Sequence, residues 1–248
     1  MISILLLIAA GLLAGALNAV AGGGTFLSFP ALVWVGVPPV IANATATLSA
    51  LPGYIGSAFA YRRDIRPGAA IGLPTLLALT VTGGLLGALL LLVTPSQVFS
   101  GLVPWLLLLA TLAFATGPTL LRLLLRQGKG LAPLPAMLLL TAICIYGGYF
   151  NGGLGIMLLA GFGLIGLSNL HQMNGLKNLL SAILSLVAVA TYIAAGLIDW
   201  PTALILAPSC AVGGVAGAWA ARRIRNMAAL RVFITVTGLA MTVAFFLS

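Results

Sequence analysis

The chain has 248 residues, of which 62% are hydrophobic and 5% are charged. This composition excludes a soluble core fold and indicates a protein that crosses a membrane several times. The net charge is +9, and the basic residues other than Lys177 lie in three short clusters at residues 62–66, 122–129 and 222–231. Such clusters are typical of cytoplasmic loops, so we expect a lipid bilayer and no nucleic acid as the environment of this chain.

The first half of the chain contains a hydrophobic segment that is interrupted by glycines. Apolar segments lie at residues 2–21, 26–37, 41–61, 69–93 and 98–121, and Gly22-Gly23-Gly24 separates the first two. The second segment is short for a full span and suits one arm of a helical hairpin. Exposed backbone groups at such a break are tolerated in a membrane only where protein or a water-filled cavity satisfies them.

The second half repeats this order of segments. They lie at residues 132–150, 156–167, 173–197, 201–221 and 229–247, and a second glycine break follows the first of them. A shift of 131 residues places Gly22 on Gly153 and Gly24 on Gly155. The sequence therefore predicts two membrane repeats, at residues 1–121 and 132–248, joined by a cytoplasmic linker at residues 122–131.

The expected fold is an all-α polytopic membrane protein with 8–10 membrane segments. Each repeat is a glycine-broken hairpin followed by three transmembrane helices, and this odd number of crossings inverts the second repeat relative to the first. The same arrangement places all basic loops in the cytoplasm and both termini outside. We expect a multi-pass protein of the cell inner (plasma) membrane.

Polar residues gather on one face of the helix that follows each break. Asn174, Lys177 and Asn178 share a face with two serines, and Asn43 and Thr47 occupy the equivalent face in the first half. Amide, hydroxyl and ammonium donors without a carboxylate favour a small anion as ligand. A lysine at the membrane centre costs about 3 kcal/mol, which favours a functional role for Lys177. The alternative is that its side chain extends to the headgroups.

The two breaks supply further candidate binding groups. Helices that start after the breaks would direct backbone N–H groups and positive dipole ends at the same anion. The alternative is that the glycines only allow close helix packing, which is our interpretation for Gly83-Gly84 and Gly213-Gly214. The predicted substrate-binding residues in the breaks are Asn18, Gly22, Gly23, Gly24, Thr25, Asn151, Gly152, Gly153 and Gly155.

Catalysis is not expected, because the chain has one histidine, two aspartates and no glutamate. No cofactor is expected either, and neither cysteine has metal-ligand spacing. His171 is a candidate for carrying a coupling proton, because an unperturbed histidine titrates near physiological pH. Its position in a polar interfacial stretch argues against that role, and an interfacial polar residue is the interpretation we favour.

Five motifs in order resemble the sulfite exporter TauE/SafE family of membrane permeases. They are residues 18–25, 42–47, 146–155, 174–178 and 196–200, and the resemblance runs from about residue 10 to the C-terminus. Many members carry a further glycine where this chain has Asn151. The resemblance implies transport of an anion with a sulfur–oxygen head group, such as sulfite or a short organosulfonate.

Together these observations predict a secondary transporter that exports a small sulfur oxyanion by alternating access. Two alternatives stay open: a non-transporting helper subunit of a larger membrane complex, and an anion channel. The expected partners are the small anionic substrate and the bilayer, and a homodimer is left open.

Overall fold

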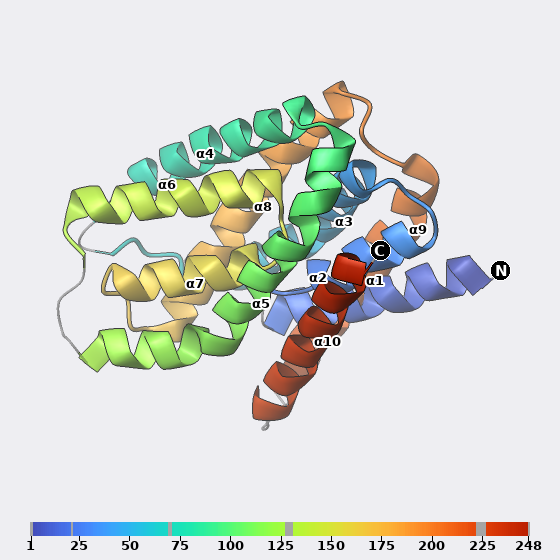
Figure 1. Ribbon diagram of the computed structural model, residues 1–248. Coiled ribbons are helices and arrows are strands. Elements are labelled where there is room, and N and C mark those ends of the chain that lie inside the picture. Colours follow the sequence, from blue (N-terminus) through green and yellow to red (C-terminus); the bar gives the residue numbers. More distant parts are fainter. Residues whose placement is uncertain (1, 21, 69–70, 127–130, 222–226, 248) are drawn as a thin grey trace.

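The structure is a computed structural model that describes residues 2–20, 22–68, 71–126, 131–221 and 227–247 (Figure 1). Every regular element in these ranges is an α-helix. The helices are α1 (Ile2–Val20), α2 (Thr25–Trp34), α3 (Pro39–Ala60), α4 (Leu73–Val93), α5 (Ser96–Arg126), α6 (Pro133–Tyr149), α7 (Leu154–Leu164), α8 (Leu170–Ala194), α9 (Trp200–Ala221) and α10 (Met227–Leu247). Helix α5 continues into the first half of the predicted linker.

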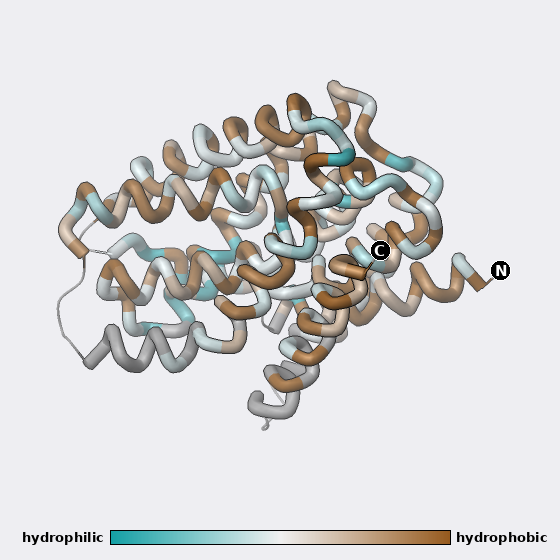
Figure 2. The backbone as a smooth tube through the Cα atoms, viewed as in Figure 1, coloured by the Kyte–Doolittle hydropathy of each residue, from teal (hydrophilic) through white to brown (hydrophobic). Residues whose placement is uncertain are grey.

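The all-helical membrane architecture is confirmed. In the described part of the chain, five helices contain a stretch long and apolar enough to cross a membrane. These stretches lie in α1, α4, α5, α8 and α9. Figure 2 shows the hydrophobic colouring along most of the chain, with hydrophilic residues restricted to short stretches. The predicted total of 8–10 membrane segments stays a prediction.

Helices from the two halves pack against each other in matching pairs. Helix α1 packs on α9, and α4 runs beside α6 (Figure 1). These are equivalent pairs, because α1 and α6 open the two halves and α4 and α9 are the fourth helices of each. Glycines make the contacts close: a Cβ atom on Gly213 would collide with the carbonyl of Leu12, and one on Gly87 with that of Ile145. Close packing is therefore confirmed for these glycine clusters, whereas the inverted relation of the halves stays a prediction.

Helices α3 and α8 pack against each other and run in opposite directions. Asn43, near the start of α3, and Tyr192, near the end of α8, both donate hydrogen bonds to backbone carbonyls at residues 148–149. At the other end, Gly175 of α8 lies against Asp64, which follows α3. The start of α3 therefore lies near the end of α8, and the start of α8 lies near the end of α3.

Both predicted breaks are present, and each is followed by a short helix. Gly22 has φ of +82° and Gly153 has φ of +75°, a left-handed conformation that side chains disfavour. The following helices, α2 and α7, have 10 and 11 residues. Neither is long enough to cross a bilayer, as expected for hairpin arms.

Candidate functional site

The two glycine breaks touch each other in the interior of the protein. A Cβ atom placed on Gly155 would lie 3.0 Å from the Cα of Gly22, and one placed on Gly22 would lie 3.1 Å from the Cα of Gly155. These separations are shorter than ordinary van der Waals contact. Two glycines are therefore needed for this approach, and we call the contact the break junction.

Lys177 lies at the break junction. Its Nζ is 3.6 Å from the Cβ position of Gly22, and its Cδ is 3.2 Å from that of Gly155. The residue is 0% exposed, and its Nζ has no hydrogen-bond partner. The side chain of Lys177 is thus enclosed by protein and does not extend to the protein surface, and the residue lies about two turns after the start of α8 at Leu170.

The same face of α8 carries further buried polar groups. Asn178 and Ser181 are 1% and 0% exposed, and both amide atoms of Asn178 and the hydroxyl of Ser181 lack a hydrogen-bond partner. At 100° per residue, Lys177, Asn178, Ser181 and Ser185 fall within an arc of about 100°. Lys177 contacts the break junction and Ser185 contacts the second break, so this face of α8 lies along the breaks. Asn174, at its N-terminal end, is partly buried.

Tyr54 of α3 connects the two breaks near this face. Its hydroxyl donates to Asn151 Oδ1 at 3.2 Å, and Asn151 Nδ2 donates to Ser185 Oγ at 2.9 Å. The side chain of Thr25, the first residue of α2, lies beside the same Tyr54 hydroxyl. Asn151 therefore takes part in a structural network, and its binding role stays a prediction.

Asn43 and Thr47 donate to backbone carbonyls, and Asn43 Oδ1 is buried without a hydrogen-bond partner. Asn43 Nδ2 donates to the carbonyl of Tyr149 at 2.9 Å, and Thr47 Oγ1 donates to the carbonyl of Asn43 at 2.8 Å. The antiparallel arrangement of α3 and α8 places Asn43 toward the Tyr192 end of α8. No contact described in the structure joins Asn43 or Thr47 to Lys177.

Some predicted backbone donors already have partners. The N–H of Gly24 donates to Asn18 Oδ1 at 2.8 Å, and the N–H of Gly22 donates to the carbonyl of Leu17 at 3.0 Å. Asn18 thus stabilises the first break. Gly23 and Gly152 are buried beside these positions, and their contact with a ligand stays a prediction.

His171 is exposed in the first turn of α8, where its backbone N–H donates to Asn169 Oδ1 at 2.9 Å. That bond caps the helix. The residue lies nearly two turns before Lys177, and a coupling role for it stays a prediction.

Two tyrosines outside the predicted site also hold the second break. Tyr146 donates to the carbonyl of Gly152 at 2.8 Å, and Tyr192 donates to that of Gly148. The sequence indicates these contacts only in a general way, because a buried tyrosine in an apolar helix normally pairs its hydroxyl with an acceptor.

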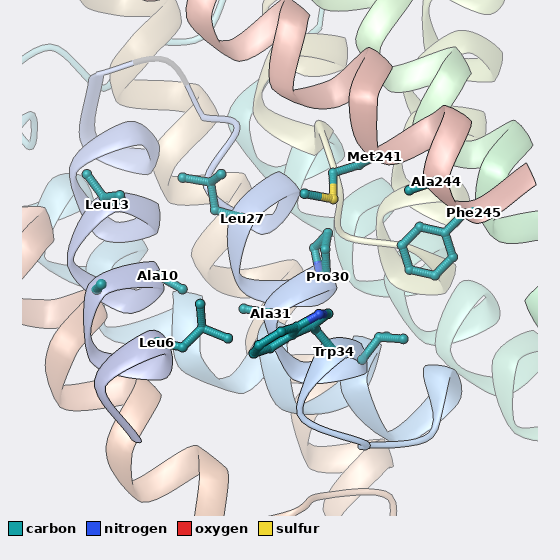
Figure 3. A pocket seen from close by; sticks show the side chains of 12 residues that line it. Leu6, Ala10, Leu13, Leu27, Pro30, Ala31, Trp34, Met241, Ala244 and Phe245 are labelled. Carbon is teal, nitrogen blue, oxygen red and sulfur yellow. The ribbon is translucent and has the colours of Figure 1, made fainter. Parts of the chain in front are cut away.

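An apolar groove lies apart from these polar groups, between α1, α2 and α10 (Figure 3). It has a volume of about 440 Å³, and its lining includes Leu6, Leu27, Trp34 and Phe245. Its carbon-lined walls offer little to a small anion. The break junction is therefore the better candidate for an anion site.

Comparison with known proteins decides the family. The family model described as sulfite exporter TauE/SafE matches residues 7–245. The chain belongs to the TauE/SafE family. The resemblance in the five motifs is thereby confirmed over nearly the whole chain.

Relatives in this family are named as membrane transporters. The chain is similar to a probable membrane transporter protein of a Sinorhizobium species, with 31% identity over 64% of this chain and 62% of the relative. It is also similar to proteins of the same description from Haemophilus influenzae and Escherichia coli. Identity is 27% with each, over 86% and 79% of this chain and 83% and 72% of the relatives. The match thus spans less than two thirds of the Sinorhizobium protein. No solved structure matches the chain. The general part of the expected function, a membrane transporter of the TauE/SafE family, is confirmed.

Proposed function

We propose that this TauE/SafE protein is a secondary transporter that moves a small sulfur oxyanion, such as sulfite or a short organosulfonate, across the bacterial inner membrane by alternating access. The observation that carries the proposal is Lys177, which is fully buried at the break junction without a hydrogen-bond partner. Burial of an uncompensated ammonium is costly, and a bound anion would offset that cost.

The surrounding groups suit an oxyanion. Lys177 offers three N–H donors, and the Asn178 amide and the Ser181 hydroxyl supply more. The only carboxylate side chains are those of Asp64 and Asp199. Asp64 follows the end of α3, and Asp199 precedes the start of α9. A sulfite or sulfonate head group presents oxygens in several directions and could accept from all three side chains.

Enclosure of the lysine supports alternating access. Because Lys177 is 0% exposed, a ligand reaches it only when the surrounding segments move. The break junction is well suited to such movement, since glycine tolerates large changes in backbone dihedral angles. We place the basic loops in the cytoplasm and both termini outside, and we assign the driving force to an ion gradient or to the membrane potential.

The test is counterflow in proteoliposomes that contain the purified chain. Unlabelled sulfite on the far side should accelerate entry of labelled sulfite in wild type, and Lys177→Met should abolish both entry and acceleration. Lys177→Arg retains a cation and serves as the matched control. Rapid entry without acceleration would indicate a channel, and no entry of any sulfur anion would favour the helper-subunit alternative; either result overturns the proposal.

A further inference from the structure

We propose that the transported species is a monoanion that also carries a hydrogen-bond donor, such as a hydroxyl or amino group on sulfur, and that the Asn178 side-chain oxygen accepts from this donor. This inference rests on the proposed function, because it assigns the ligand of the same site. It depends on the Asn178 carboxamide and on the number of charges at the break junction.

Asn178 presents an acceptor as well as a donor. It is 1% exposed, and neither Nδ2 nor Oδ1 has a hydrogen-bond partner. A carboxamide offers one acceptor oxygen and one donor nitrogen whichever way it is turned. One of the two unpartnered groups is therefore an oxygen in any orientation.

That oxygen discriminates between ligands. An anion that only accepts hydrogen bonds can pair with Lys177, with Ser181 and with the Asn178 nitrogen, but it leaves the Asn178 oxygen beside further oxygen lone pairs. A buried acceptor left without a donor is unfavourable. A ligand with a donor on sulfur pairs both atoms of the amide, and sites built around such hydrogen bonds strongly reject analogues that lack the group.

Charge favours a monoanion. Among the buried residues that the structure describes, Lys177 is the only one with a charged side chain. One negative charge on the ligand neutralises it, whereas a dianion would leave a net buried charge, which is costly. Hydrogensulfite with its proton on oxygen and sulfamate with its amino group on sulfur meet both requirements, and sulfate meets neither.

The experiment compares two ligands of equal charge and similar size by calorimetric binding to the purified full chain. Sulfamate carries an amino group on sulfur where methanesulfonate carries a methyl group. Wild type should bind sulfamate at least about tenfold more tightly. Asn178→Leu should lose this preference, and it should bind both ligands more weakly than wild type because it also loses the nitrogen donor. Thr80→Val, a buried change in α4, should keep the wild-type preference.

The outcomes separate this inference from the proposed function. Equal affinity of wild type for both ligands overturns the donor inference and leaves the anion site standing. Binding of neither ligand, nor of sulfite, overturns the proposed function itself. An unchanged preference in folded Asn178→Leu overturns the role of Asn178. If that variant does not fold, as judged by thermal unfolding, the wild-type comparison alone decides whether the ligand needs a donor.

Discussion

Lys177 is a residue at which stability and function conflict. Its amine is buried without a partner, so an apolar side chain of similar length should fit the folded protein at least as well. We predict that Lys177→Met leaves the ligand-free protein equally stable or stabilises it by up to about 3 kcal/mol, while stabilisation by anions disappears. Thermal unfolding in detergent with and without sulfite measures both quantities. A less stable variant that still responds to sulfite would contradict this prediction.

Gly22 and Gly155 allow the close approach of the breaks. A glycine can be required there because of a positive φ or because of a close neighbouring atom, and alanine variants separate these two effects. Gly22 has positive φ and a close neighbour, Gly155 has the neighbour alone, and exposed Gly36 has φ of +95° with no atom near its Cβ position. Gly36→Ala should cost about 1–2 kcal/mol from backbone strain. Gly22→Ala should cost more than Gly36→Ala, and Gly155→Ala should weaken sulfite binding because it displaces Lys177. Equal costs for Gly22→Ala and Gly36→Ala would show that the junction is not tightly packed.

Among the elements, the two hairpins are held unequally. Side chains from α3, α6 and α8 donate to the carbonyls of Tyr149, Gly152 and Gly148 in the second hairpin. In the first hairpin, the Gly24 N–H donates to Asn18 of the same hairpin, and the polar side-chain contact with another helix is that of the Thr25 side chain with the Tyr54 hydroxyl of α3. The first hairpin is therefore the better candidate for the moving part.

Amide hydrogen exchange tests this difference between the hairpins. We expect backbone amides at residues 22–25 to exchange faster than those at residues 150–153, because exchange follows local opening. Asn18→Ala should accelerate exchange in the first break and leave the second unchanged. Faster exchange in the second break would assign the movement to the α6–α7 hairpin.

The fold could be predicted further than the site. Segment order, short hairpin arms and close glycine packing follow from hydropathy and glycine spacing, which are local properties of the sequence. Helical periodicity also identified the α8 face that contains Lys177. The predicted inversion of the repeats already implies that α3 and α8 run in opposite directions, but it does not show that Asn43 donates to the carbonyl of Tyr149. Contacts between distant segments, such as Gly22 with Gly155, depend on tertiary packing that no local pattern contains.

At the scale of the whole molecule, the charge distribution predicts the orientation in the membrane. Arg62 and Arg63 are exposed in the turn after α3. With both native cysteines replaced by alanine, a single cysteine at position 63 should react with a membrane-impermeant thiol reagent only from the cytoplasmic side. A cysteine added at either terminus should react from outside. Labelling of position 63 and of a terminus from the same side would contradict the proposed inverted repeats.

The central claim is that Lys177 at the break junction binds a small sulfur oxyanion. Calorimetric titration of sulfite into purified wild type, Lys177→Met and Lys177→Arg tests it most directly. We predict binding to wild type, weaker binding to Lys177→Arg and none to Lys177→Met, with all three proteins folded. Equal affinity of wild type and Lys177→Met for sulfite would contradict the claim.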